Sequence, residues 1–159
     1  MNNSPKISSH YMQRAKFEML TVQQFYLVAK LRQDVFIVEQ QSIYTDLDGL
    51  DQEAMHYLYW SSSQIDAELI GYARYRQLPS ANDFQIERVV FSPAWRGKGI
   101  GTLIMRTMLQ DIKAEHQHAQ IKLSAQIEAK LFYHKLGFLA EGESYVDGGI
   151  EHITMYYQV

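Results

Sequence analysis

Residues 96–101 of the chain read Arg-Gly-Lys-Gly-Ile-Gly and separate two segments of different hydrophobic pattern. The segment before them, residues 84–91, is rich in β-branched and aromatic residues and predicts a β-strand. The segment after them, from Ile100 to Ile112, repeats apolar side chains at helical spacing and predicts an amphipathic helix of about four turns. The chain is therefore expected to pass from a strand through a glycine turn into a helix.

Such a glycine turn favours a phosphate group. Unpaired backbone N–H groups collect at a helix N-terminus, and the helix dipole adds partial positive charge there. Gly97, Gly99 and Gly101 would let the main chain approach an anion closely, and Arg96 and Lys98 add positive charge. A Walker A loop does not fit because Gly99 stands where Ser or Thr is needed, and the third glycine of a dinucleotide fingerprint is missing. A turn whose glycines serve helix packing alone remains an alternative.

Length and composition predict one folded domain. The chain has 159 residues, the size of an ordinary single domain. Of these residues 47% are apolar and 13% aromatic, enough to build a core that offsets the entropy of folding. We expect residues 1–10 to form a mobile leader and residues 11–159 to form the domain.

Charge and cysteine content exclude several classes of function. The formal net charge is −3 with acidic and basic residues interspersed, which argues against a dedicated nucleic-acid or anionic-membrane binder. The absence of cysteine excludes disulfides, thiolate nucleophiles and thiolate metal sites. No apolar stretch has the length of a membrane span, and the N-terminus lacks the apolar core of a signal peptide. We expect a cytoplasmic protein with no nucleic-acid or membrane partner.

The remaining segments alternate between strand and helix patterns. Thr21 with Gln24 predicts a capping box that opens a helix running to about residue 34. A hairpin is expected from residues 57–60 and 68–78. The other expected elements are strands at 12–19, 121–125, 138–146 and 152–159, and a helix at 129–135 that stops before Gly137.

Two stretches resemble metal-binding patterns without meeting them. Residues 46–51, Asp-Leu-Asp-Gly-Leu-Asp, begin like a calcium loop, but Tyr57 stands where that loop needs its bidentate glutamate. We therefore expect an acidic surface turn there. His116 and His118 lie close in sequence without a third ligand at a suitable spacing, so no metal site is predicted.

Three motifs together resemble one known family. Arg96-x-x-Gly99-x-Gly101, placed between a strand and an amphipathic helix, resembles the acyl-CoA pyrophosphate loop of the GCN5-related N-acetyltransferase (GNAT) family. Residues 129–138, Ala-Lys-Leu-Phe-Tyr-His-Lys-Leu-Gly-Phe, resemble the family's A…FYxKxGF segment. Residues 31–40, Leu-Arg-Gln-Asp-Val-Phe-Ile-Val-Glu-Gln, are similar to a signature of its ElaA/YjcF-like subgroup. The resemblance covers roughly residues 21–156, and it departs at Glu151, where members commonly carry proline.

The resemblance implies a fold and an activity. The fold would be mixed α/β (α+β), the acyl-CoA N-acyltransferase fold, with a central, mostly antiparallel, splayed sheet flanked by helices. The activity would be transfer of acetyl from acetyl-CoA to a primary amine of a small molecule or peptide, by direct attack in a ternary complex. A homodimer would be common among relatives. A non-catalytic acyl-CoA binding or sensing module remains the alternative, and a structural interaction domain without CoA affinity is a third.

The resemblance also implies residue roles. Tyr133 stands where the family places a general acid that protonates the departing CoA thiolate. Glu87 stands where many relatives place a carboxylate that draws the proton from the amine, directly or through water. Strict alternation along its strand gives two sets, with Glu87, Val89 and Phe91 on one face and Ile86, Arg88 and Val90 on the other.

Two further sets of residues follow. The predicted cofactor-binding residues are Val89, Val90, Phe91, Arg96, Gly97, Lys98, Gly99, Ile100, Gly101 and Gln126. The predicted acceptor-binding residues are polar groups in or beside the subgroup signatures, namely Glu39, Tyr44, His56, Arg74 and His152.

Overall fold

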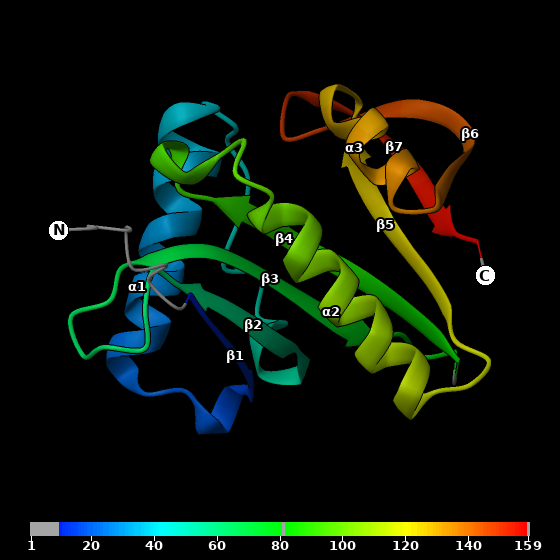
Figure 1. The fold of residues 1–159 in the computed structure, drawn as a ribbon. Helices are drawn as coiled ribbons and strands as arrows, with labels where there is room; N and C mark the ends of the chain where they lie inside the picture. The colour runs from blue at the N-terminus through cyan, green and yellow to red at the C-terminus, as the bar shows by residue number, and fades with distance from the viewer. Residues whose placement is uncertain (1–9, 81, 159) are drawn as a thin grey trace, which may run out of the picture.

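In the computed structural model, which describes residues 10–80 and 82–158, one sheet of seven strands is covered by helices on both faces (Figure 1). The strands are β1 Tyr11–Lys16, β2 Met55–Trp60, β3 Leu69–Gln77, β4 Asp83–Phe91, β5 Gln120–Gln126, β6 Phe138–Asp147 and β7 Ile150–Tyr157. The helices are α1 Val22–Arg32, α2 Ile100–Glu115 and α3 Lys130–Lys135, with a π-helix η2 Gln33–Glu39. Short 3-10 turns are η1 Phe17–Met19, η3 Asp51–Glu53, η4 Pro93–Trp95 and η5 Ile127–Ala129. Apart from His10, the predicted leader lies outside the described residues.

The sheet consists of two antiparallel halves joined by one parallel pair. The strand order is β1-β2-β3-β4-β5-β7-β6, and only β4 and β5 run parallel among the described strands. Their register pairs residues 83–86 with residues 120–123 and then ends. Beyond Ile86 and Leu123 the two strands separate, as the diverging green and yellow strands of Figure 1 show. The mostly antiparallel, splayed sheet predicted from the resemblance is therefore confirmed.

The helices bury both faces of the central strands. On β2, Tyr57 and Tyr59 pack into the cluster that contains α2, while Leu58 and Trp60 pack into the cluster that contains α1. Both side-chain sets are at most 9% exposed, so this strand has no polar face. Burying a large apolar side chain contributes about 1.5 to 3 kcal/mol, so both clusters stabilise the sheet between its helices. No helix in the described ranges combines the length and the apolar character needed to cross a bilayer.

The first helix begins as predicted and ends differently. Thr21 Oγ1 accepts a hydrogen bond from the Gln24 amide at 3.1 Å, and Gln24 Oε1 accepts one from the Thr21 amide at 3.0 Å, which completes the capping box. The α-helix stops at Arg32, and the chain continues as the π-helix η2 to Glu39. An apolar spacing of three to four residues predicts a helix but does not separate α from π geometry, so the predicted end near residue 34 was wrong.

A bulge in β4 overturns the predicted alternation. Tyr72 pairs with Val90 and Arg74 with Glu87, so two β4 residues lie opposite the single residue Ala73. One of them, Arg88, has a φ of +56°. As a result Ile86 packs on the α2 side while Val90 packs on the α1 side, although alternation predicts that they share a face. The extra residue shifts everything after it to the opposite side.

Candidate active site

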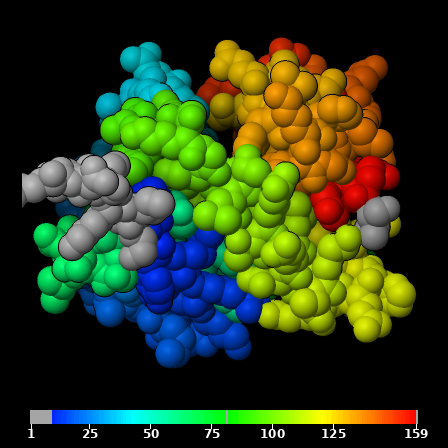
Figure 2. Space-filling model, in the orientation of Figure 1, coloured from blue at the N-terminus to red at the C-terminus, as the bar shows by residue number. Residues whose placement is uncertain are grey.

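A pocket of about 650 Å³ opens where β4 and β5 separate. Its walls come from β4, the glycine turn, the start of α2, β5, α3, the chain after η2, and the β6–β7 turn. In Figure 2 the two halves of the molecule meet at a furrow between the green residues that follow β4 and the orange residues of α3 and β6. The pocket therefore spans both halves of the sheet.

The glycine turn at one end of the pocket has the geometry of an anion site. Gly97 and Gly99 have φ values of +74° and +80°, which L-residues adopt only at a cost in energy. A Cβ at either position would meet no atom within 4 Å, so the space beside the turn is open. Gly99 is the N-cap of the sixteen-residue helix α2, whose first N–H groups have no intrahelical partner. These features place unpaired donors beside open space.

Gly101 serves packing instead. A Cβ at this position would lie 3.1 Å from Phe132 Cζ and 3.2 Å from the ring of Phe91. Glycine here lets α2 approach both β4 and α3 closely. The two explanations weighed for the turn thus apply to different glycines.

The two basic side chains of the turn have partners within the protein. Arg96 donates to the Glu39 carboxylate at 2.5 and 2.9 Å and to the Phe91 carbonyl at 3.2 Å. The hydrogen bond from Arg96 lowers the pKa of Glu39 below its ordinary value. Lys98 lies with Nζ 4.7 Å from the centroid of the Trp95 ring, and neither Lys98 nor Glu39 lines the pocket. The predicted acceptor-binding residue Glu39 thus lies outside the pocket lining, with its carboxylate bound to Arg96 of the glycine turn.

Tyr133 lines the pocket from α3. It is 8% exposed, and its ring packs between Phe132 and Phe138 at centroid distances of 5.0 and 6.0 Å. Burial raises the pKa of its phenol above the ordinary value, so the group is protonated at neutral pH. Within the described residues its hydroxyl has no hydrogen-bond partner, which leaves the hydroxyl available to a ligand.

Glu87 lines the pocket as an ion-paired carboxylate. It accepts a hydrogen bond from Arg74 Nε at 3.0 Å and from Arg76 Nε and Nη2 at 3.0 and 2.7 Å. Its side chain is 10% exposed. The Glu87 carboxylate is therefore salt-bridged and mostly buried at the pocket wall.

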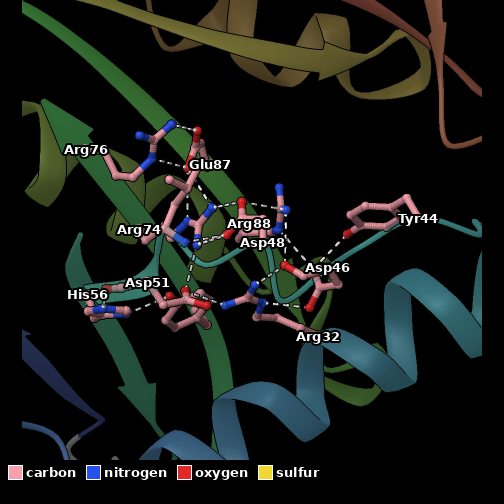
Figure 3. A network of polar contacts seen from close by, with 12 residues as sticks. Arg32, Tyr44, Asp46, Asp48, Asp51, His56, Arg74, Arg76, Glu87 and Arg88 are labelled. Carbon is pink, nitrogen blue, oxygen red and sulfur yellow. Dashed lines mark hydrogen bonds and ion pairs between the residues drawn. The ribbon is translucent and has the colours of Figure 1, made fainter. Parts of the chain in front are cut away.

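A buried network of arginines and carboxylates lies next to the pocket (Figure 3). Arg32 binds Asp46 at 2.9 Å and Asp51 at 2.7 Å, and Arg74 also binds Asp51 at 2.7 Å. Asp46 and Asp51 are 9% and 4% exposed. The prediction of an acidic surface turn at residues 46–51 is therefore wrong, because three arginines from distant positions in the sequence turn its carboxylates inward. No set of three or more His, Asp or Glu side chains in the described part of the chain is arranged to hold a metal ion.

His56 and Arg74 belong to this network and not to the pocket. Both are fully buried, and neither lines the pocket. His56 Nε2 donates to the Asp51 carbonyl at 2.8 Å, and Nδ1 accepts from the Tyr72 hydroxyl at 2.7 Å. Burial lowers the pKa of His56, so the ring is neutral. Of the predicted acceptor-binding residues, the structure therefore places these two in the buried network and outside the pocket lining.

The other predicted residues are brought together around the pocket. The lining includes Tyr44, Val89, Val90, Phe91, Arg96, Gly97, Gly99, Ile100, Gly101, Gln126 and His152. Gln126 Nε2 donates to Gln40 Oε1 at 2.9 Å, which links β5 to the chain after η2 across the pocket.

Sequence reasoning missed part of the lining. The missed polar residues are Gln40, Ser42, Gln85, Arg88, Thr102, Ser124 and Asp147. Gln40 is the last residue of the subgroup signature at residues 31–40, and its place in that signature was the signal that could have identified it as a site residue. Alternation predicts Arg88 on the face opposite Glu87, whereas in the structure both residues line the pocket and Arg88 lies in the β4 bulge.

Comparisons with known proteins agree with this geometry. The curated relatives include protein ElaA of Escherichia coli, 36% identical over 145 residues that cover 88% of this chain and 91% of ElaA. They also include the UPF0039 protein sll0451 of Synechocystis, 35% identical over 146 residues that cover 91% of this chain and 92% of the relative.

Solved structures give the same result. An acyl-CoA N-acyltransferase from Pseudomonas aeruginosa superposes with a TM-score of 0.84 at 32% identity, over 94% of this chain and 100% of the other. The crystal structure of E. coli ElaA also gives a TM-score of 0.84 at 32% identity, over 94% and 99%. The family model described as acetyltransferase (GNAT) domain matches residues 18–159. This chain therefore belongs to the GNAT acetyltransferase family.

Proposed function

We propose that this protein transfers acetyl from acetyl-CoA to a primary amine by direct attack of the amine in a ternary complex. The observation that carries the proposal is the continuity of one pocket. It has open anion-binding donors at Gly97 and Gly99 at one end, and it is also lined by the unpaired hydroxyl of Tyr133.

The cofactor would lie along the splay. Its pyrophosphate would accept hydrogen bonds from the first turn of α2, with Arg96 beside it. The pantetheine arm would follow residues 89–91 of β4, whose β5-facing backbone groups have no strand partner beyond Ile86, with Gln126 on the other side. The paiA N-acetyltransferase of Thermoplasma acidophilum, solved with coenzyme A, shares this fold with a TM-score of 0.66 at 15% identity.

The transfer would proceed in one addition and one elimination. The neutral amine attacks the thioester carbonyl, a C–N bond forms, and a β4 backbone N–H stabilises the oxyanion. The C–S bond then breaks and Tyr133 donates its proton to the thiolate, while the nitrogen loses its proton to a water molecule positioned by Glu87. Tyr133 regains a proton from water, so one proton leaves the nitrogen for each one given to sulfur. Glu87 is held in one orientation by two arginines, so its part is to position the acceptor amine or the water molecule that takes the proton of the amine.

Calorimetric titration tests the cofactor class first. The expected result is binding of acetyl-CoA and free CoA, with none of NADH or ATP. Gly99→Asp is expected to abolish CoA binding, because it adds a strained side chain and a negative charge at the turn. The matched control is Gly142→Asp, since Gly142 has a φ of +78° and the same open surroundings but lies on β6 outside the pocket.

A thiol-release assay with a broad amine panel then tests catalysis. Release of CoA thiol with at least one amine supports the transferase. Binding of CoA without thiol release for any amine would favour the non-catalytic acyl-CoA module. Absence of CoA binding would overturn both and leave an interaction domain.

A further inference from the structure

Four charged side chains line the pocket, namely Glu87, Arg88, Arg96 and Asp147. Glu87 is neutralised by Arg74 and Arg76, and Arg96 is neutralised by Glu39. The remaining two are Arg88 and Asp147, which both line the pocket. Asp147 lies at the end of β6 and forms no ion pair within residues 10–80 and 82–158.

The Arg88 guanidinium is held rigidly. Its Nε lies 2.9 Å from Asp46 Oδ1, and its Nη2 lies 3.1 Å from Asp48 Oδ2. Its guanidinium carbon lies 5.2 Å from the centroid of the Tyr44 ring, at the distance of a cation–π contact. The side chain is 18% exposed, so a long, normally mobile residue is fixed in one orientation beside the pocket.

The backbone of Arg88 is strained to give this orientation. Arg88 and Gln41 are the only non-glycine residues with positive φ in the described part of the chain, and Arg88 has a φ of +56° within the β4 bulge. A non-glycine residue in this region is strained and persists where the surrounding structure demands it, often at ligand sites. The bulge begins directly after the last β4–β5 pair, at the point where the splay opens.

Two of the three guanidinium nitrogens of Arg88 lack a hydrogen bond. Nε is buried and close to Asp46, but its geometry does not form a hydrogen bond. Nη1 has no partner within the described residues, and Figure 3 shows one terminal nitrogen of Arg88 directed away from the carboxylates. A preformed guanidinium with an unused Nη1 can donate its two N–H groups to a carboxylate, and such charge-assisted hydrogen bonds are strong.

Arg88, whose Nη1 is an unused donor, and Asp147, which forms no ion pair within residues 10–80 and 82–158, have opposite charges. A ligand that carries both an amine and an anionic group would place its anion at Arg88, while Asp147 attracts its positive charge. In the placement proposed above, the cofactor brings no anion to Arg88. Its pyrophosphate lies at the glycine turn, and the pantetheine arm near β4 is uncharged.

We propose that the acceptor is an amine that also carries a carboxylate, and that Arg88 binds this carboxylate and sets acceptor specificity. The inference rests on the proposed acetyl transfer to an amine. The reaction would convert an amino carboxylate and acetyl-CoA into the N-acetyl amino carboxylate and CoA thiol, with one C–N bond formed and one C–S bond broken.

The experiment compares matched acceptors that differ only at the carboxylate. A panel of α- and ω-amino acids is tested against the corresponding carboxamides and against diamines of similar length, by thiol release and by calorimetric binding to the protein–CoA complex. The wild type is expected to prefer at least one amino acid over its carboxamide by about tenfold or more in kcat/KM and in binding. Arg88→Gln is expected to reduce that preference to about twofold or less, with Arg88→Lys in between, because lysine keeps the charge and loses the fork.

Two controls make the outcome decisive. Arg106→Gln removes the same charge from an exposed position of α2 and is expected to keep the preference. Unchanged acetyl-CoA affinity of Arg88→Gln shows that the variant is folded, since Asp46 and Asp48 keep Arg32 and Arg74 as partners.

Each alternative result has one meaning. Equal use and equal binding of amino acids and carboxamides, diamines as the better acceptors, or a preference that survives in Arg88→Gln would overturn the inference. Carboxylate-selective, Arg88-dependent binding without thiol release would support the acceptor class and overturn the catalytic proposal instead.

Discussion

The Glu39 carboxylate binds the Arg96 guanidinium through both oxygens, at 2.5 and 2.9 Å. Glu39 ends the π-helix η2, whereas Arg96 belongs to the glycine turn, so the pair joins two pocket walls that are distant in sequence. An anion bound at the turn would compete with this carboxylate for the same guanidinium.

Glu39→Gln is therefore expected to tighten CoA binding by about threefold or more at low salt, with a smaller gain at high salt where charges are screened. Calorimetry at two salt concentrations measures the change. Glu18→Gln, an exposed acid in η1, is the matched control for net charge and should leave CoA affinity unchanged. Weaker binding by Glu39→Gln would show that Glu39 holds Arg96 in place for the ligand and does not compete with it.

Tyr133→Phe removes one hydroxyl and keeps the packing between Phe132 and Phe138. We expect turnover to fall by about tenfold or more, with acetyl-CoA affinity nearly unchanged, because the proton donor acts only in the transition state. Steady-state thiol release and calorimetry give the two numbers. Equal turnover of variant and wild type would remove Tyr133 from the role of general acid.

Arg32→Met tests the buried network. Arg32 is fully buried and neutralises Asp46 and Asp51, so its loss leaves two buried carboxylates with fewer partners. The free energy of unfolding is expected to fall by about 3 kcal/mol or more in urea denaturation. Lys30→Met, two residues earlier on α1, breaks only an exposed pair with Asp34 and should have no measurable effect. Similar stabilities of the two variants would contradict a structural role for the network.

The neutral His56 predicts a pH dependence of stability. Its pKa is lowered in the fold by burial, so between that value and the unfolded pKa near about 6.5 the unfolded chain binds more protons than the folded one. This group's contribution is complete above about pH 6.5 and is lost as the pH falls, by at most about 1.4 kcal/mol per pH unit. Ring chemical shifts from NMR should show His56 titrating below about 6.5. A His56 pKa above this value would contradict the buried neutral ring.

Local signals in the sequence were sufficient for most of the fold. Thr21 with Gln24 marks the start of α1, and the glycines from Gly97 to Gly101 mark the passage from β4 to α2, because capping and positive φ depend on residues near in sequence. The pocket end formed by the glycine turn was predictable for the same reason.

The rest of the site depends on contacts between distant residues. The pattern of residues 46–51 predicts an exposed turn, but in the fold its carboxylates bind Arg32, Arg74 and Arg88. These arginines are distant in sequence, so no local spacing predicts the contacts. The bulge at Arg88 contains no glycine or proline, so the sequence gives no local signal for it. It nevertheless reverses the faces of the β4 residues that follow it. Strand periodicity fails here because it assumes an unbroken register.

β4 and β5 pair over only four residues, which is the shortest strand pairing among the described strands. The chain crosses from one half to the other once, through α2, and the pocket straddles the opening. A ligand bound there would contact both half-sheets, so ligand binding would raise the free energy of unfolding. Saturation with ligand should therefore slow amide hydrogen exchange in both halves of the sheet together, because a ligand bound in the pocket would stabilise the whole fold.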